Sequence, residues 1–77
     1  MSLKIKGIVT WFREDKGYGF LHTEDRKDIF VHYSSITGEG FKTLKEDDGV
    51  LFELREGTKG LQAYEVEKIK WLTMILI

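Results

Sequence analysis

Four residues with flat rings are spaced two apart in two short β-rich runs of the sequence. Tyr18 and Phe20 lie in the first run, and Phe30 and His32 lie in the second. Because strand side chains alternate between faces, each pair shares one face and the residues between take the other. Rings on a solvent-facing sheet can stack on unpaired nucleobases, and each such contact contributes roughly 1–3 kcal/mol. The spacing therefore predicts a base-stacking surface.

The alternative is that these rings fill the core, which is the usual fate of phenylalanine. Leu21, Ile29 and Val31 alternate with the rings and are natural core residues. A chain of 77 residues forms one thin-cored domain, which cannot bury both faces of two strands. We therefore expect the aliphatic residues inside and the rings outside, where a contiguous apolar patch needs a functional reason.

Further aromatic and basic residues lie close to these two runs. Trp11 and Phe12 end the preceding run, and Phe41 lies in a later loop. Lys16 would place a cation for a phosphate at the edge of the rings. The glycines at positions 17 and 19 would remove side chains that obstruct a ligand's approach.

Residues suited to catalysis or metal binding are sparse. Ser34 has no evident activating base with an orienting acid, so we interpret it as a turn or cap residue. His22 stands near Glu24 and Asp25, but nothing completes a metal shell, and the chain has no cysteine. We expect no enzyme activity, no metal, no cofactor and no small-molecule substrate.

Five β-rich runs, separated by turn clusters, are predicted to position these residues. The runs cover 5–13, 18–23, 28–33, 50–55 and 61–69, with a long link over 34–48. In the fourth run Val50, Phe52 and Leu54 are expected to face inward. This order is the topology of an all-β, five-stranded antiparallel Greek-key OB-fold barrel. We expect the barrel domain to cover residues 1–69.

Net charge and cysteine content indicate less about function than the spacing of the rings does. The 12 Lys and Arg residues against 13 Asp and Glu give a formal net charge of −1, so the usual basic footprint of nucleic-acid binding is missing. Any such binding must rely on stacking and on local charge. The N-terminus has no signal-peptide run, and the lack of cysteine suits a reducing compartment. We expect a cytoplasmic monomer that does not bind membranes.

The last residues, 70–77, form an apolar tail that the barrel does not explain. The tail is shorter than the roughly 20 residues that span a bilayer, so we do not interpret it as a membrane anchor. Packing on the barrel or self-association is the favoured interpretation, with a severed membrane segment, a truncation end and a disordered end as alternatives. Its uncharged, β-prone composition is also an aggregation hazard.

Two motifs resemble the ribonucleoprotein motifs of bacterial cold-shock proteins and Y-box cold-shock domains. They are Lys-Gly-Tyr-Gly-Phe-Leu at 16–21 and Asp-Ile-Phe-Val-His-Tyr at 28–33. Supporting blocks at 7–12, 34–36, 38–44 and 59–63 are similar to the same family, and the resemblance covers about 5–66. RNA-recognition-motif domains have the two motifs reversed and far apart, so the order favours the cold-shock family.

The resemblance implies a protein that binds short, often pyrimidine-rich, single-stranded RNA or DNA. It also implies a passive RNA-chaperone role, in which binding of unpaired bases shifts hairpins toward the open form without ATP. The alternative is a protein-interaction or self-associating module that uses the ring face and the tail. By resemblance, Phe12 and Lys16 support the stacking positions, which are Trp11, Tyr18, Phe20, Phe30, His32, Tyr33 and Phe41.

Several positions depart from the pattern of the family. Thr10 stands where the family usually has Lys, and Arg13 replaces a usual Asn. Leu61 replaces a usual Pro, and Tyr64-Glu65 replaces a small residue and Asn. These changes leave the rings in place and are expected to weaken the basic rim and to alter the fifth strand.

Overall fold

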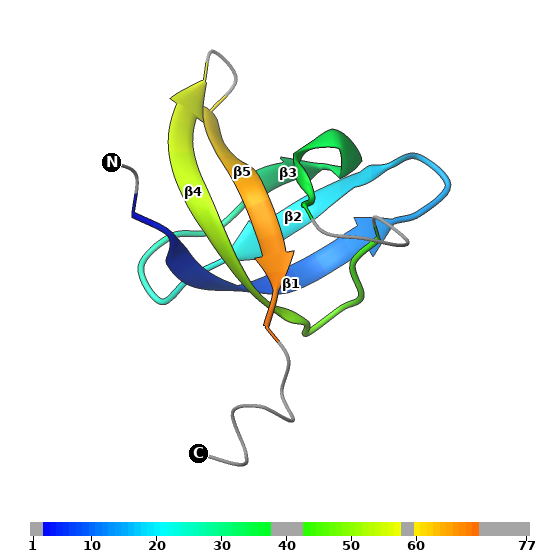
Figure 1. Cartoon of the computed structure of the whole chain (residues 1–77), viewed down its shortest axis with the longest axis horizontal. Coiled ribbons are helices and arrows are strands. Elements are labelled where there is room, and N and C mark those ends of the chain that lie inside the picture. The colour runs from blue at the N-terminus through cyan, green and yellow to red at the C-terminus, as the bar shows by residue number, and fades with distance from the viewer. Residues whose placement is uncertain (1–2, 38–42, 58–59, 70–77) are drawn as a thin grey trace.

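Alternating aliphatic residues close the chain into a five-stranded barrel (Figure 1). The computed structural model describes residues 3–37, 43–57 and 60–69. The 3₁₀ helix η1 (Tyr33–Ser35) follows the third strand, and the strands are β1 (Ile5–Arg13), β2 (Tyr18–His22), β3 (Ile29–His32), β4 (Gly49–Gly57) and β5 (Gly60–Lys68). The predicted all-β barrel is confirmed, and the predicted strand ends differ from the observed ones by at most two residues.

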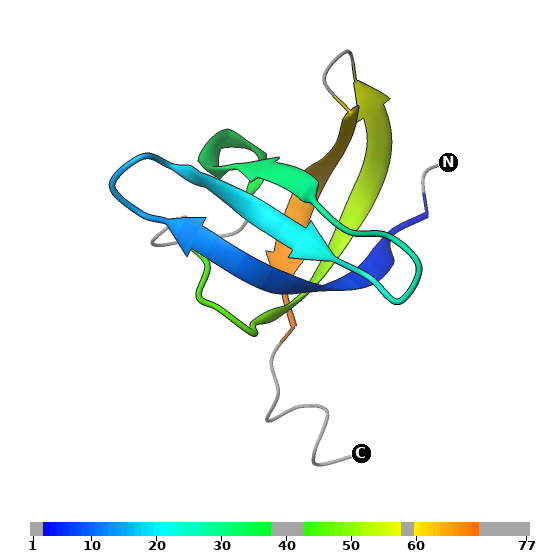
Figure 2. The same ribbon diagram turned by 180° about the vertical axis from the view of Figure 1, so that it is seen from behind.

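The strands follow one another around the barrel in the order β1-β2-β3-β5-β4. Four pairings are antiparallel, as predicted: β1 with β2, β1 with β4, β2 with β3, and β4 with β5. The pairing of β3 with β5 is parallel, through Phe30 and Gln62, and a parallel bridge joins Ile36 to Val66. The long link between β3 and β4 provides the crossover that a parallel pair needs. Figure 2 shows β1, β2 and β3 side by side in front of the crossing β4–β5 hairpin.

The core lies inside the barrel and is aliphatic apart from one phenylalanine. Its fully buried side chains are Val9, Leu21, Ile29, Val31, Val50, Phe52 and Val66. Full burial of side chains of this size contributes roughly 1.5–3 kcal/mol each. Ile36, Leu44 and Ala63 complete the core at 4% exposure or less. Of the three residues expected to face inward on β4, Val50 and Phe52 are buried, whereas Leu54 only packs against the core's edge.

A bulge in β5 interrupts its pairing with β4. Leu51 pairs with Glu67 and Glu53 pairs with Tyr64, so β5 carries one extra residue in this stretch. Glu65 has a φ of 50°, in the left-handed region that non-glycine residues rarely adopt. No helix among the described ranges is both long enough and apolar enough to cross a bilayer.

Candidate nucleic-acid interface

Five rings cover the outer face of β1, β2 and β3, and we call them the aromatic platform. They are Trp11, Tyr18, Phe20, Phe30 and His32. The predicted alternation is confirmed, because Leu21, Ile29 and Val31 have no exposed surface. Trp11 is 36% exposed, and the other four rings are partly exposed. Large apolar rings therefore remain at the surface of a barrel whose interior is already filled.

Four of the platform rings, those of Trp11, Tyr18, Phe20 and Phe30, contact one another in a continuous cluster. The ring centroids of Trp11 and Phe20 lie 5.2 Å apart, and those of Phe20 and Phe30 lie 5.8 Å apart. Tyr18 lies 6.0 Å from Trp11 and 5.9 Å from Phe30. Most of these contacts are tilted or edge-on, which aromatic pairs prefer to a face-to-face sandwich. The rings consequently hold one another in place while part of each remains open to solvent.

A bulge in β1 brings Trp11 onto the platform. Val9 pairs with Leu21, but Trp11 already pairs with Phe20, so Thr10 is an extra residue in β1. In a regular strand Trp11 would share the inward face of Val9. The extra residue re-aims the indole outward, as bulges do near binding sites. Thr10, which replaces a usual family lysine, uses its hydroxyl in a 2.7 Å hydrogen bond with Nδ1 of His22.

The same bulge turns Phe12 toward the interior. Phe12 is partly buried and packs against the hydrophobic core. It pairs with Gly19, which has no side chain to occupy that position. Phe12 thus packs beneath this surface, and the supporting role in binding that the resemblance implies stays a prediction.

The helix η1 fixes the ring orientation of His32 at the edge of the platform. Nδ1 of His32 accepts a hydrogen bond from the backbone N–H of Ser34 at 3.2 Å, and Oγ of Ser34 lies 2.8 Å from the same atom. His32 therefore caps η1, and Ser34 is a turn residue as predicted. Tyr33 is 49% exposed, and its ring centroid lies 4.6 Å from that of His32. Sequence reasoning did not anticipate the contact between Ser34 and His32.

The two glycines beside the rings make room for the protein itself. A Cβ on Gly19 would lie 2.2 Å from the carbonyl oxygen of Trp11. A Cβ on Gly17, whose φ is 76°, would lie 2.7 Å from the ring of Tyr33. The expectation that these glycines clear a path for a ligand is wrong, because protein atoms already fill the space beside them.

Charge around the platform is locally balanced. The turn between β1 and β2 carries Arg13 and Lys16, together with Glu14 and Asp15, and all four are exposed. Lys16 lies in this turn beside Tyr33, and both line a shallow hollow. Within the described residues neither basic side chain is held in an ion pair. Two basic side chains with no ion-pair partner in the described ranges therefore lie at the edge of the platform, and the two acidic residues beside them keep the local net charge near zero.

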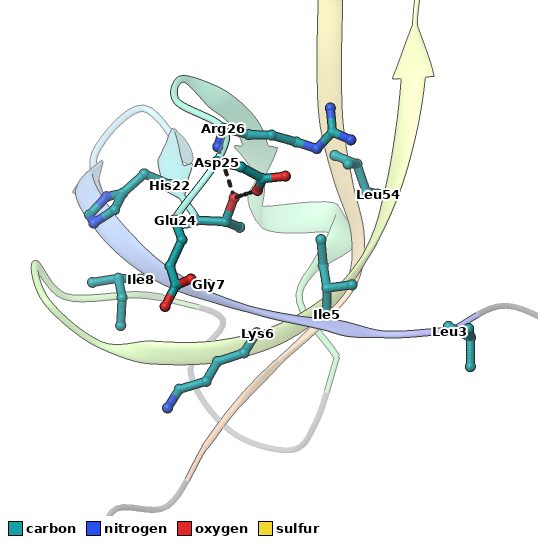
Figure 3. A pocket seen from close by; sticks show the side chains of 11 residues that line it. Leu3, Ile5, Lys6, Gly7, Ile8, His22, Glu24, Asp25, Arg26 and Leu54 are labelled. Carbon is teal, nitrogen blue, oxygen red and sulfur yellow. Dashed lines mark hydrogen bonds between the residues drawn. The ribbon is translucent and has the colours of Figure 1, made fainter.

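A hollow of about 790 Å³ lies at the end of the barrel beside the β2–β3 turn, and none of the platform rings lines it (Figure 3). Its floor is apolar, with Ile5 and Leu54, and its rim carries both acidic and basic side chains. Asp25 at the rim accepts a hydrogen bond from Thr23 at 2.9 Å. Across the described ranges, no three side chains of the metal-ligating types gather together.

One predicted stacking residue, Phe41, lies outside the described residues, as does the tail at 70–77. The structure adds a contact that sequence reasoning missed. The guanidinium carbon of Arg55 lies 4.5 Å from the ring centroid of Tyr64, on the outer face of the β4–β5 hairpin. From the sequence alone, Tyr64 is a departure from the family pattern with no predicted role.

A closed five-stranded barrel with an exposed cluster of rings on three adjacent strands defines a small β-barrel binding protein. The profile of the 'Cold-shock' DNA-binding domain family matches residues 5–69. The chain therefore belongs to the cold-shock domain family, whose members bind nucleic acid and are not enzymes.

Bacterial relatives resemble the chain over most of its length. The major cold shock protein of Micrococcus luteus is 55% identical over 64 residues, which are 82% of this chain and 96% of the relative. Cold shock protein CspB of Bacillus caldolyticus is 50% identical over 64 residues, covering 83% and 97%. Cold shock-like protein CspC of Escherichia coli K12 is 54% identical over 67 residues, covering 86% and 97%.

Proposed function

We propose that this protein binds single-stranded RNA or DNA by stacking unpaired bases on the aromatic platform. The observation that carries the proposal is the exposed ring cluster over a core that is already filled. Every base has a flat π-face, so stacking tolerates many sequences, and each stacked base contributes roughly 1–3 kcal/mol. Phe12 packs beneath the rings, and Tyr33 and Lys16 extend the proposed contact surface. Phe41 is a further proposed stacking residue, on the resemblance to the family.

The binding is led by stacking and only assisted by charge. The net charge is −1, and Arg13 and Lys16 share their turn with two acidic residues. Each phosphate contact on a single strand contributes about −0.7 to the slope of log affinity against log salt. A small number of contacts therefore gives a shallow salt dependence. Short pyrimidine-rich segments are the proposed ligands, on the pattern of the family.

A passive RNA-chaperone activity follows from this mode of binding. Bases in a duplex are already stacked and paired, so the platform reaches them only after the duplex has opened. Binding to the open form alone shifts the equilibrium toward it, by no more than the difference in affinity between the two states. The reaction requires no nucleotide hydrolysis.

Fluorescence of Trp11 tests the proposal directly, because its indole is a platform ring. The Trp71→Phe variant leaves Trp11 as the only tryptophan. Titration with a short oligothymidine should quench this fluorescence and give a saturable binding curve. The same strand hybridised to its complement is the control and should quench far less. An unchanged emission from Trp11 at saturating single strand would contradict stacking on the platform.

A further inference from the structure

The outer face of the barrel continues beyond the aromatic platform in one register row. Trp11 pairs with Phe20 across β1 and β2, and Phe20 pairs with Phe30 across β2 and β3. Phe30 then pairs with Gln62 of β5, and Gln62 pairs with Arg55 of β4. Register partners on neighbouring strands lie about 5 Å apart. The row therefore runs without a gap from the rings to the β4–β5 hairpin.

Burial shows that this row faces outward along its whole length. Ala63, the neighbour of Gln62 in β5, is 2% exposed and belongs to the core. Because side chains alternate, Gln62 points to the opposite, outer face. Arg55 lies opposite Gln62, and its side chain is 53% exposed. Figures 1 and 2 show the hairpin of β4 and β5 crossing the direction of β1, β2 and β3, and β5 is the strand that pairs with β3.

Arg55 is held in a fixed position at the end of the row. Its guanidinium carbon lies 4.5 Å from the ring centroid of Tyr64, within the range of a cation–π contact. Its Nε donates to Oε1 of Glu53 at 2.6 Å. Tyr64 in turn donates its hydroxyl to Oε1 of Gln62 at 2.6 Å. A ring, a carboxylate and an amide therefore position one flat, exposed cation.

The chemistry of this arrangement favours a base over a phosphate. The side chain of Glu53 is only 14% exposed, and its carboxylate offsets the charge of Arg55 at short range. A guanidinium that is already paired attracts a further anion weakly. Its guanidinium carbon lies over the Tyr64 ring, and because the Arg55 side chain is 53% exposed, part of the guanidinium stays open to a ligand. Arg guanidinium planes are established stacking partners for unpaired bases in single-stranded recognition.

We propose that Arg55, held by Tyr64 and Glu53, is an additional nucleobase-stacking subsite that extends the aromatic platform across β5. The ligand is a base of the same single strand, one or more nucleotides beyond those on the rings. The subsite rests on the proposed function, because it is reached only by a strand that already lies on the platform. It makes the footprint longer than the rings alone would give.

Two variants of Arg55 separate base stacking from phosphate binding. Arg55→Ala removes both the plane and the charge, whereas Arg55→Lys keeps the charge and removes the plane. Binding is measured to oligothymidines of increasing length, at several salt concentrations. Arg26→Ala is the matched control, since it removes an exposed arginine of the β2–β3 turn that lines the hollow at the end of the barrel and belongs to no pair of the row.

We expect both Arg55 variants to bind a long strand roughly fivefold more weakly than the parent, which corresponds to the lower end of one base stack. Both should bind the shortest strands like the parent, and neither should change the salt slope. Two further long strands each lack one terminal base, one strand at the 5′ end and the other at the 3′ end. The parent should bind one of these two strands roughly fivefold more weakly than the complete strand. That loss should vanish in Arg55→Lys.

Three results would overturn the subsite. Parent-like binding of long strands by both variants would mean that no ligand reaches Arg55. A loss in Arg55→Ala with rescue in Arg55→Lys and a shallower salt slope would mean a phosphate contact. An equal loss in Arg26→Ala would mean a general charge effect. Failure of the proposed function looks different, because the parent itself would then bind no strand of any length.

Discussion

The backbone N–H of Ser34 points at Nδ1 of His32, at a distance of 3.2 Å. A ring nitrogen that accepts a hydrogen bond carries no proton, so the neutral ring must carry its proton on Nε2. The first turn of η1 thereby selects one tautomer of a platform residue. His32 presents an N–H donor at its other edge, where a base on the platform can offer a carbonyl or ring nitrogen.

This hydrogen bond predicts the nitrogen-15 NMR spectrum of His32 when its imidazole ring is uncharged. Nε2 should show the shift of a protonated ring nitrogen, and Nδ1 that of an unprotonated acceptor. The Ser34→Ala variant should keep the same tautomer, because the backbone N–H remains. A spectrum with the proton on Nδ1 would mean that His32 donates to Oγ of Ser34 instead, and would contradict this tautomer.

Loss of a platform ring should weaken binding without unfolding the barrel. Phe20→Ala and Phe30→Ala are each expected to reduce the free energy of binding to a short oligothymidine by about 1–3 kcal/mol. Fluorescence titration measures the effect, and urea unfolding checks that each variant is folded. Leu3→Ala, which truncates an 83% exposed apolar side chain off the platform, is the control and should bind like the parent. Parent-like binding by both ring variants would exclude the stacking mechanism.

The salt dependence of binding should be shallow. In the part of the chain that the structure describes, few unpaired basic side chains border the platform. Each phosphate contact on a single strand adds about −0.7 to the slope of log affinity against log salt. Affinity for oligothymidine is measured over a range of salt concentrations in the parent and in Lys16→Ala. The slope of log affinity against log salt should be shallower in the variant by about 0.7, the contribution of one phosphate contact. A steep slope in the parent would show that charge, rather than stacking, leads the binding.

The backbone of Glu65 predicts a stabilising substitution. Its φ of 50° lies in the left-handed region, which costs most residues roughly 1 kcal/mol or more and costs glycine little. Glu65→Gly and Glu65→Asn should therefore raise the free energy of unfolding by up to about 1 kcal/mol. Glu65→Ala keeps the strain and separates it from the effect of charge. If Ala stabilised the barrel as much as Gly, charge and not backbone strain would be the cause.

Gly19 should be among the least replaceable residues of the barrel. Its added Cβ would meet the carbonyl oxygen of Trp11 at 2.2 Å and the Cα of Phe12 at 2.6 Å, and neither backbone can move freely. We expect Gly19→Ala to lower the free energy of unfolding by at least about 1–3 kcal/mol, the usual cost of overpacking. Gly57→Ala is the comparison, since its closest contact is a flexible glutamine side chain at 3.2 Å. Equal stability of the two variants would contradict the packing role of Gly19.

Period-two alternation was enough to predict the strands and the outward face of β2 and β3. Leu21 and Val31 are fully buried, and Phe20 and Phe30 between them are not, because a small barrel has one interior to fill. The bulge at Thr10 was not predictable from alternation, since it depends on how β1 registers with β2. Only the resemblance to the family placed Trp11 correctly among the outward rings.

Contacts between residues far apart in the sequence were also not predictable from the sequence. The glycines beside the rings suggested room for a ligand, but Gly17 faces Tyr33, sixteen positions later in the chain. The cation–π contact of Arg55 with Tyr64 joins two strands through the hairpin register, and no pattern in the neighbouring sequence predicts it. The predicted stacking role of Phe41 stays a prediction, because this residue is outside the described ranges.

The guanidinium of Arg55 also bears on how binding responds to pH. The hydrogen bond with Glu53 is the main cause that raises the pKa of Arg55 above its ordinary value, against a smaller opposing effect of desolvation. A cation whose pKa is raised by folding adds stability below its unfolded pKa, while its partner Glu53 is ionised, and loses that contribution as the pH rises through the folded pKa, in strong alkali. The guanidinium of Arg55 therefore keeps its positive charge throughout the neutral pH range.

The parallel pairing of β3 with β5, which closes the barrel and which we call the seam, has a consequence for the order in which the barrel folds. Every platform ring comes from residues 11–32, on three strands joined by two short turns. The seam is held by the Phe30–Gln62 pair and the Ile36–Val66 bridge, which join segments some thirty residues apart in sequence. Closing a long loop costs more entropy than closing a short one, so the meander can form first. The aromatic platform would then form early in folding. The row that leads to Arg55 becomes continuous only when β5 pairs with β3 and closes the barrel.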